Sequence, residues 1–348
     1  MIQTVTLNPA PGDMHHMRIS VAYKLRSNKA DANAKLLTKE EVDWICNAVR
    51  NLDHTVTPIE VSGSAEKVKD RLHKSRPALI MNLAPGMVDG REDTYYPDLY
   101  RELGIPHTGG SAEFLRVNLN KNRSKEILSS KGVRVPAGAL ITSRDDKIPQ
   151  DLGFPVIIKP NLESSSKGIT QESVAESAED AREHIHALLD DYPGGLLVEA
   201  FIPGRELCVP FVENFPGKIL SVVEYTFDHE DDPGVRYDIF DYDMKQEGES
   251  AKVVKPVCPA PLNGVERNAV TEMARQVFEI LQCPDIGRVD IRLHENGDPY
   301  FIELNPIPSL HPKASLPVAA RYHHLELRDI MRLVIRSASE RNGLDVTA

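Results

Sequence analysis

The sequence predicts an α/β protein with more than one domain, and three observations support this prediction. The chain has 348 residues, which corresponds to roughly two domains of about 100–200 residues each. Hydrophobic residues make up 41% of the chain and charged residues 27%, so a sizeable core is available and global disorder is excluded. Strand and helix patterns also alternate through the first 110 residues, as in a parallel sheet.

The first domain is predicted over residues 17–110, behind a leader at 1–16 that we expect to be disordered and either native or a cloning remnant. Turn-forming residues fill the leader. Thr38 is placed to cap the first helix, because Glu41 follows three residues later and a hydrophobic face repeats behind it. The predicted elements are strands at 17–23, 55–61 and 78–83 and helices at 38–52, 65–74 and 97–103.

Two further domains are predicted, at 111–204 and 205–348. We expect a single helix at 111–131 to open the second domain. A long helix at 264–281 belongs to the third. The remaining predicted elements are strands at 154–159, 195–199, 206–213 and 218–226, helices at 177–190 and 324–341, and a hairpin at 287–305.

Charge and cysteine content narrow the range of partners. Lysine plus arginine number 41 and aspartate plus glutamate 52, so the net charge of −11 disfavours general binding to nucleic acid or anionic membranes. No apolar run reaches the length of a membrane span, and the start of the sequence lacks a signal-peptide pattern. The four cysteines form no CxxC pair, which argues against zinc and for a reducing compartment. We therefore expect a cytoplasmic protein.

The predicted hairpin of the third domain brings two acidic side chains together. Asn-Gly at 296–297 is a strong signal for a two-residue turn in which both residues adopt positive φ. Counting outward from that turn, Asp290 opposes Glu303, and Arg288 opposes Asn305 in the same way. Side chains alternate between the faces of a strand, so these four share one face. The opposite, core face is expected to hold Val289, Ile291, Ile302 and Leu304.

The opposed carboxylates indicate a metal site. Directly opposed residues lie about 4.5–5.5 Å apart at Cβ and like charges there destabilise a sheet, so an Asp facing a Glu needs a cation. Oxygen ligands of this kind suit Mg²⁺, which usually binds together with substrate phosphates. Asn305 supplies a neutral oxygen and Arg288 a positive charge beside the metal. The alternative is a solvated polar face of an edge hairpin, and a register slip of one residue would separate the pair.

A second group of residues is suited to phosphate. The strand at 154–159 ends in Lys159, and the serine-rich loop at 161–168 follows it. Small hydroxyl residues let backbone N–H groups approach a phosphate while their side chains donate further hydrogen bonds. A flexible linker is the alternative for such a loop. Two further segments, at 196–206 and 241–245, complete a candidate nucleotide site, although each by itself also fits surface decoration.

The order of these motifs resembles the ATP-grasp superfamily and, within it, the D-alanine–D-alanine ligases. The resemblance covers roughly Leu79 to Leu333, most of the chain. Each motif is weak alone, but their order and spacing together are specific. The matching stretches are Gly104–Gly109, Val156–Pro160 with Ser164–Gly168, Val198–Glu206, Asp241–Lys245 with Cys258–Ala260, Gly287–Asp290, Phe301–Asn305 and Ser315–Ala320.

This resemblance implies an ATP-grasp fold with ATP bound between the sheets of the second and third domains, together with two Mg²⁺ ions or, as the alternative, Mn²⁺. The implied phosphate-binding residues are Lys121, Lys159, Ser165, Ser166 and Lys245. The implied adenine and ribose contacts are Glu199, Ala200, Phe201, Ile202, Ile302 and Glu206. The implied metal ligands are Asp290, Glu303 and Asn305, which agrees with the hairpin face deduced above. The implied substrate contacts are Ser309, His311, Ser315 and Leu316.

The chemistry that the resemblance implies has two steps. A carboxylate attacks the γ-phosphate of ATP to give an acyl phosphate and ADP, and an amine then attacks the acyl carbon and expels phosphate. Lysines and magnesium offset the charge of the transferred group. The implied catalytic residues are Arg288, Lys245 and Ser165, with a backbone N–H near Ser309 helping Arg288 to stabilise the oxyanion.

The sequence departs from the family where substrates bind. Residues 23–30 lack the family's glycine-rich turn and the glutamate that holds the first substrate's ammonium, and Ala84 stands at the place of a histidine. One extra residue precedes Ser315. We therefore expect a ligase for other amino-acid-like carboxylate and amine substrates. Lys24 and Arg26 either face an acidic group of the substrate or lie exposed at the surface.

Three alternatives stay open at this point. The chain could be a D-alanine–D-alanine ligase proper with an unusual first domain, or an intramolecular cyclo-ligase. It could also be a catalytically silent ATP-binding regulatory protein. Against the last stands the retention of Lys245, Arg288, Asp290, Glu303 and Asn305. The resemblance further implies a homodimer through the first domain.

Overall fold

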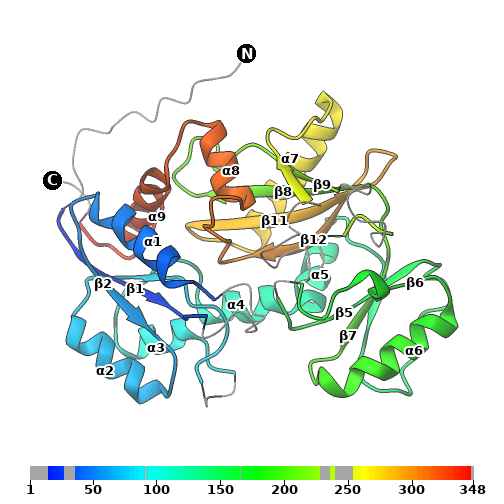
Figure 1. The fold of residues 1–348 in the computed structure, drawn as a ribbon. Coiled ribbons are helices and arrows are strands. Elements are labelled where there is room, and N and C mark those ends of the chain that lie inside the picture. Colours follow the sequence, from blue (N-terminus) through cyan, green and yellow to red (C-terminus); the bar gives the residue numbers. More distant parts are fainter. Residues whose placement is uncertain are drawn as a thin grey trace.

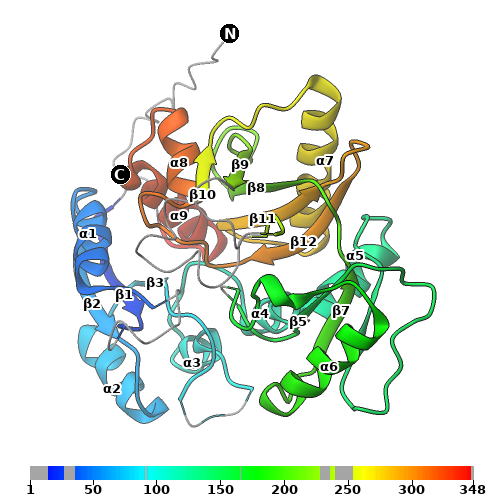
Figure 2. The same ribbon diagram turned by 45° about the vertical axis from the view of Figure 1, so that its right-hand side comes forward.

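The computed structural model describes residues 15–26, 36–89, 91, 93–164, 166–227, 236–239 and 254–345. These residues contain three sheets that follow one another along the chain (Figure 1). The three-stranded sheet lies at the lower left of the view, the four-stranded sheet at the lower right, and the five-stranded sheet above both (Figure 2). The mixed α/β class predicted from the sequence is confirmed.

The first sheet is parallel, as predicted, with strand order β2-β1-β3. The Thr38 hydroxyl accepts a hydrogen bond from the Glu41 N–H at 3.2 Å, and the Glu41 carboxylate accepts one from the Thr38 N–H at 2.8 Å. This reciprocal capping confirms the predicted start of the first helix. The elements are β1 (Arg18–Tyr23), α1 (Lys39–Arg50), β2 (Thr55–Glu60), α2 (Ala65–Ser75), β3 (Leu79–Asn82) and α3 (Tyr96–Glu102).

The second sheet is antiparallel, with strand order β4-β7-β5-β6. Helix α6 packs on one of its faces, and residues of β5 and β7 line a pocket that the second sheet shares with the third. The elements are β4 (Gly138–Ile141), β5 (Val156–Pro160), β6 (Val174–Ala175), α6 (Ala178–Leu188) and β7 (Leu196–Ala200), with short 3₁₀ turns η1 (Gln171–Ser173) and η2 (Leu189–Asp191).

The third sheet is antiparallel, with strand order β10-β9-β8-β11-β12. Helix α7 covers one face, while α8 and α9 share a core with α1 on the other side. The strand predicted from residue 218 begins at Val223, the closing helix predicted from 324 begins at Leu327, and α8 was not predicted. The elements are β8 (Arg205–Val212), β9 (Val223–Phe227), β10 (Val254–Val257), α7 (Gly264–Ile280), β11 (Ile286–Leu293), β12 (Pro299–Asn305), α8 (Ser315–Tyr322) and α9 (Leu327–Arg341).

The single helix predicted at 111–131 is wrong, because the segment forms α4 (Ala112–Leu119) and α5 (Lys121–Ser130). Asn120 interrupts the helix with a ψ of 97°, and its side chain accepts a hydrogen bond from the Arg123 N–H at 2.9 Å. An N-cap of this kind starts a new helix. Side chains of α4 and α5 pack into the α7 side of the third sheet's core. Although α4 and α5 contact the third sheet's core, nothing in the structure tests the domain boundary predicted at residue 111, which stays a prediction.

A buried carboxylate joins the first sheet's segment to the third. Asp285 has 0% of its surface exposed and accepts hydrogen bonds from the Gly109 N–H at 2.7 Å and the Ser337 hydroxyl at 2.6 Å. Arg341 pairs with the same carboxylate at 2.6 Å. Because Ser337 and Arg341 lie on α9, these contacts fix the end of the first segment against the third sheet.

No helix within the described ranges is long and apolar enough to cross a bilayer.

The hairpin β11–β12 has a different turn from the one predicted. Of the Asn-Gly pair, Gly297 alone adopts positive φ, at 88°. The His294 N–H donates to the Asp298 carbonyl at 3.0 Å, so the loop spans residues 295–297 instead of two residues. A three-residue loop with glycine in the left-handed region is a common alternative to the primed two-residue turn. By itself, this loop moves the register one residue away from the predicted one.

A β-bulge restores the predicted register where it matters. Ile291 pairs with Phe301, one residue out of the predicted register, but the register shifts before Asp290, which directly faces Glu303. A bulge of this kind adds one residue to one strand. The expectation that Ile302 lies on the core face is therefore wrong. Phe301 is 0% exposed and fills the core instead, while Ile302 faces the pocket.

Candidate active site

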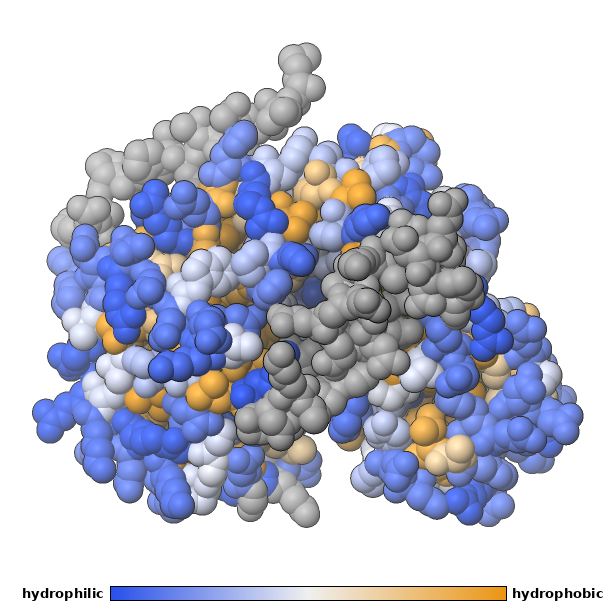
Figure 3. Space-filling model, in the orientation of Figure 1, coloured by the Kyte–Doolittle hydropathy of each residue, from blue (hydrophilic) through white to orange (hydrophobic). Residues whose placement is uncertain are grey.

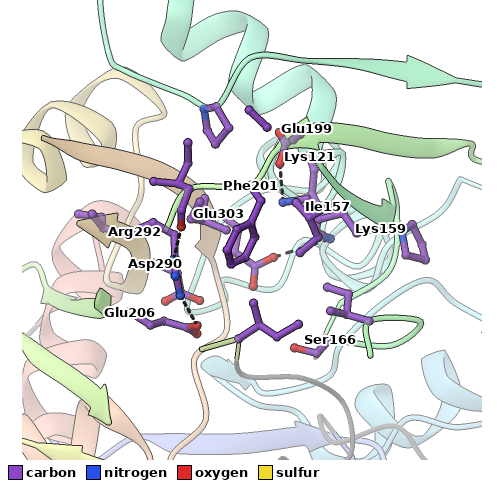
Figure 4. Close-up of a pocket in the computed structure, with 18 of the residues that line it drawn as sticks. Lys121, Ile157, Lys159, Ser166, Glu199, Phe201, Glu206, Asp290, Arg292 and Glu303 are labelled. Atoms are coloured by element: carbon purple, nitrogen blue, oxygen red, sulfur yellow. Dashed lines mark hydrogen bonds and ion pairs between the residues drawn. The ribbon is translucent and has the colours of Figure 1, made fainter. Parts of the chain in front are cut away.

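A pocket lies between the second and third sheets, with β5 and β7 on one side and β11 and β12 on the other (Figure 4). It encloses ≈ 870 Å³, counting the part that opens to solvent. Most of the residues predicted to bind ATP and metal line it. They are Lys121, Lys159, Ser166, Glu199, Ala200, Phe201, Ile202, Glu206, Asp290, Ile302 and Glu303.

The third-sheet wall carries the predicted carboxylate pair. Arg288 pairs with both oxygens of Asp290, Nε with Oδ1 at 2.6 Å and Nη2 with Oδ2 at 2.7 Å. The Asn305 amide nitrogen donates to Asp290 at 2.9 Å and to Glu303 at 3.2 Å. Lys121 Nζ lies 3.7 Å from Glu303 Oε2. The carboxylates of Asp290 and Glu303 can thus lie side by side because neighbouring cations and an amide N–H group offset their repulsion.

The donor set fits a hard divalent cation. Carboxylate and amide oxygens from Asp290, Glu303 and Asn305 are the ligands that Mg²⁺ prefers. The Asn305 amide group touches both carboxylates, so the three side chains converge on one point. Within the described part of the chain, no three His, Cys, Asp or Glu residues cluster around a common metal position. Asn305, whose amide nitrogen here donates to both carboxylates, would supply the third protein ligand through its amide oxygen.

Burial and charge fix the protonation of two neighbours of Asp290. The Cys208 thiol donates to Asp290 Oδ1 at 3.2 Å. Burial, reinforced by the Asp290 charge, raises the pKa of Cys208 well above its usual value, so the thiol stays protonated. Burial alone would lower the pKa of Arg288, but Asp290 outweighs it and holds that pKa well above the usual value. Cys208 was not predicted; it lies beside Asp290 because β8 pairs with β11.

The second-sheet wall contains a buried charge cluster centred on Glu199. Lys125 and Lys159 both pair with the Glu199 carboxylate, Lys159 at 2.7 Å, and all three side chains are at most 6% exposed. Burial raises the pKa of Glu199, but the two lysines more than offset this and lower it. Burial lowers the pKa of Lys125 to about 7 even though Glu199 opposes that shift. Lys125 was missed, although it lies one helical turn after Lys121.

Apolar side chains form the part of the pocket suited to a flat ring. Ile157 and Phe201 come from the second-sheet side and Ile302 from the third-sheet side. The Phe201 ring also makes an edge-on contact with Tyr237, with 5.3 Å between the ring centroids. Burial between aliphatic and aromatic side chains is typical of cofactor pockets with few polar anchors.

Arg292 holds the segment that follows β7. It donates to the Ile202 carbonyl at 3.0 Å and to the Gly204 carbonyl at 2.8 Å. It also lies 5.5 Å from the Phe201 ring centroid and 3.4 Å from Glu206 Oε2. Sequence reasoning missed Arg292, although strand alternation from Arg288 and Asp290 puts residue 292 on the same face.

The predicted phosphate loop follows β5. Ser166 adopts a φ of 58° and Gly168 a φ of 75°. A Cβ at Gly168 would lie 2.5 Å from the Tyr192 hydroxyl, so glycine is required where the loop folds back. The Lys121 ammonium donates to the Glu163 carbonyl and ties the loop to α5. Ser165 and Lys245 lie outside the described residues, so their implied roles stay predictions.

The predicted substrate residues do not line the pocket. Ser309 is exposed and its hydroxyl accepts a hydrogen bond from the His311 N–H at 3.2 Å. Ser315 and Leu316 are each 0% exposed at the start of α8. Lys24 is half-buried and pairs with Asp89 at 2.8 Å, so its charge is balanced within the protein.

Comparisons with known proteins show the family to which the chain is similar. A family model described as D-ala D-ala ligase C-terminus matches residues 137–336. The D-alanine–D-alanine ligase of a Thermotoga species is 32% identical over 248 residues, 70% of this chain and 75% of the relative. That of Thermotoga petrophila is 30% identical over 295 residues, 84% of this chain and 89% of the relative.

Solved structures show the same fold. The D-alanine–D-alanine ligase from Bacillus anthracis complexed with ATP has a TM-score of 0.72 at 18% identity, covering 94% of this chain and 99% of its own. The VanG D-Ala:D-Ser ligase from Enterococcus faecalis has a TM-score of 0.71 at 19% identity, covering 93% of this chain and 99% of its own.

Proposed function

Because this chain belongs to the D-alanine–D-alanine ligase family, we propose that its pocket joins the carboxylate of one amino-acid-like molecule to the amine of another. The chain is an ATP-dependent, ADP-forming carbon–nitrogen ligase. The observation that carries the proposal is the opposed pair of Asp290 and Glu303 beside the permanently charged Arg288. The pair faces a pocket whose other wall supplies lysines and apolar side chains.

In the proposed first step, an oxygen of the substrate carboxylate attacks the γ-phosphorus of ATP. The bond from that phosphorus to the β-phosphate oxygen breaks, which gives ADP and an acyl phosphate. Lys121 and Lys159, both in the pocket wall, bind the phosphates and offset the charge on the transferred group. Ser165, Ser166 and Lys245 supply further donors in the proposal.

Asp290, Glu303 and Asn305 hold two Mg²⁺ ions in this proposal, with Mn²⁺ as the alternative. ATP-grasp ligases of this family use ATP and a divalent metal. When bound, the metal neutralises phosphate charge and orients the triphosphate. Ile157, Phe201 and Ile302 enclose the adenine, the backbone of Ala200 and Ile202 reads its edge, and Glu206 binds the ribose.

In the proposed second step, the nitrogen of the amine substrate attacks the acyl carbon. The carbonyl oxygen becomes an oxyanion, which Arg288 stabilises because Asp290 holds the guanidinium in place at 2.6 Å and 2.7 Å. The carbon–oxygen bond to phosphate then breaks and phosphate leaves. The nitrogen loses its extra proton to the departing phosphate or to water, which leaves a neutral amide.

ADP release across a panel of amino acids and dipeptides, each tested as acid and as amine, tests this proposal. We expect one class of acid–amine pair to stimulate ADP release in a Mg²⁺-dependent manner. No stimulation by any pair would favour the ATP-binding regulatory protein. D-alanine ligation is the second candidate, because the relatives at 30–32% identity are D-alanine–D-alanine ligases. Full turnover with D-alanine alone would establish it.

The compartment and the assembly are also part of the proposal. All four cysteines are free thiols, which supports a reducing cytoplasm. A homodimer through the first domain is expected from the family resemblance, and sedimentation of the purified chain measures it.

A further inference from the structure

A second hollow, which we call the substrate cleft, opens beside the phosphate loop. Residues 24, 25, 36 and 85–89 form one side of it, and residues 160–164 and 192–195 form the other. It encloses ≈ 2680 Å³, counting the part open to solvent. Pro160 and Glu163 line both this cleft and the nucleotide pocket, so the two spaces adjoin at these residues. In the space-filling view, a notch lies at the bottom of the molecule, between the lower-left part that contains the first sheet and the lower-right part that contains the second (Figure 3).

The walls of the substrate cleft expose apolar side chains from two domains. Met87, in the loop after β3, is 47% exposed, and Leu162, directly after β5, is 51% exposed. Large apolar residues of these types are usually buried. Half-buried apolar side chains that also line the cleft are Leu25, Leu119 and Ile307. A concave apolar surface of this kind marks a ligand site.

The position of Leu162 is fixed by a glycine. A Cβ at Gly194 would lie 2.5 Å from Leu162 Cδ1 and 2.6 Å from Leu162 Cγ. Any larger residue at 194 would therefore displace the leucine side chain. The contact keeps Leu162 flat against the 192–195 turn with its other side open to the cleft.

Six charged residues line the cleft, and five of them form ion pairs with other residues that the structure describes, including Glu60 with Arg71 at 3.6 Å; Asp93 is the sixth and is exposed. The other ion pairs are Lys24–Asp89 at 2.8 Å, Arg91–Glu102 at 3.2 Å and Glu163–Lys167 at 3.2 Å. The Asp89 carboxylate also accepts a hydrogen bond from the Gly63 N–H at 2.8 Å. At these five residues a charged substrate side chain would have to break an ion pair, whereas an apolar one would not. The apolar surface is therefore left as the main means of recognition.

We propose that the carboxylate substrate carries a bulky apolar side chain, of leucine or phenylalanine size, which lies in the substrate cleft against Met87 and Leu162. This inference rests on the proposed function, because the carboxylate that attacks ATP must lie beside the phosphate loop. The cleft meets the nucleotide pocket at Glu163 of that loop. A methyl side chain leaves both residues in contact with water, whereas a larger apolar one removes their surface from it.

The test compares acids under conditions that do not depend on the amine site. Hydroxylamine serves as the common amine, because it traps an acyl phosphate as a hydroxamate. Values of kcat/KM are measured from ADP and hydroxamate for the D and L forms of leucine, phenylalanine and alanine. We expect the bulky acids to exceed alanine by about tenfold or more, since one methylene in an apolar pocket is worth about 10–200-fold.

Equal or better turnover of alanine would overturn the proposal and leave the ligase function intact. ADP release that no acid stimulates, with ATP still bound, would instead overturn the ligase function together with the proposal. The two failures are therefore distinguishable in one experiment.

Variants locate the effect in the cleft. Leu162→Ala and Met87→Ala should each lower the leucine-to-alanine ratio of kcat/KM by about tenfold. Gly194→Ala should lower the same ratio by displacing Leu162 without removing it. Val265→Ala is the matched control, because Val265 is 80% exposed and lies outside the cleft. An unchanged ratio in Leu162→Ala and Gly194→Ala, with an unchanged KM for ATP, would refute the assignment.

Discussion

Replacing Lys125 by methionine should change how the stability of the protein depends on pH. Burial beside Glu199 and Lys159 lowers the pKa of Lys125 from its ordinary 10.5 to about 7. Between these values the unfolded chain binds a proton at this site and the folded chain does not. The free energy of unfolding therefore rises with pH across this window, by up to about 1.4 kcal/mol per pH unit from this group.

The expected magnitude follows from that slope. From pH 7 to pH 9, Lys125 alone should add about 2 kcal/mol to the free energy of unfolding, and methionine, which has no proton to lose, should add none. Glu199 keeps Lys159 as its partner at 2.7 Å in the variant, so no carboxylate is left unpaired. Its lowered pKa keeps it ionised across the whole window. The difference between wild type and variant should thus grow with pH.

Urea unfolding at pH 7, 8 and 9 measures this difference. Lys131→Met is the matched control, since Lys131 is exposed at the end of the same helix. The control should show the same pH dependence as the wild type. The free energy of unfolding of the wild type minus that of Lys125→Met should increase with pH. If this difference stays constant or decreases as pH rises, the pKa of Lys125 is not lowered by burial.

Three further predictions concern the metal site, the nucleotide site and the fold. Glu303→Gln should lower Mg²⁺-dependent ADP release by at least about 10–100-fold, the loss typical of groups that support a metal site, and unchanged turnover would remove Glu303 from that site. Lys245→Ala should weaken turnover with its melting temperature intact, whereas a protein that no longer melts cooperatively would indicate a structural role. Asn120→Ala should lower the free energy of unfolding in urea by about 1 kcal/mol, because the start of α5 loses the hydrogen bond from the Arg123 N–H. An unchanged urea midpoint would show that this cap does not stabilise the start of α5.

The hairpin shows how far pattern reasoning reaches. The facing of Asp290 and Glu303 was predicted from an ideal Asn-Gly turn, yet the turn has an extra residue and the bulge at Ile302 compensates for it. Two departures of one residue cancel, so the carboxylates meet as predicted. The predicted pattern contained no signal for a bulge, and only the structure shows that Phe301 rather than Ile302 fills the core.

Two of the residues missed in the site were missed for a cause that local patterns do not contain. Lys125 and Cys208 take their roles from neighbours far along the chain, Glu199 and Asp290, that only the sheet pairings and helix docking bring near. The break at Asn120 was hidden because the residues around it favour helix on both sides. Arg292, in contrast, follows from simple alternation along β11 and was open to prediction.

An oxygen label tests the proposed chemistry most directly. The acid substrate is prepared with ¹⁸O in its carboxylate and turned over with ATP, Mg²⁺ and an amine. Because a carboxylate oxygen becomes bonded to the γ-phosphorus and its bond to carbon later breaks, one ¹⁸O atom should appear in each released phosphate. Phosphate free of label, with amide still formed, would contradict the acyl-phosphate route on which the account depends.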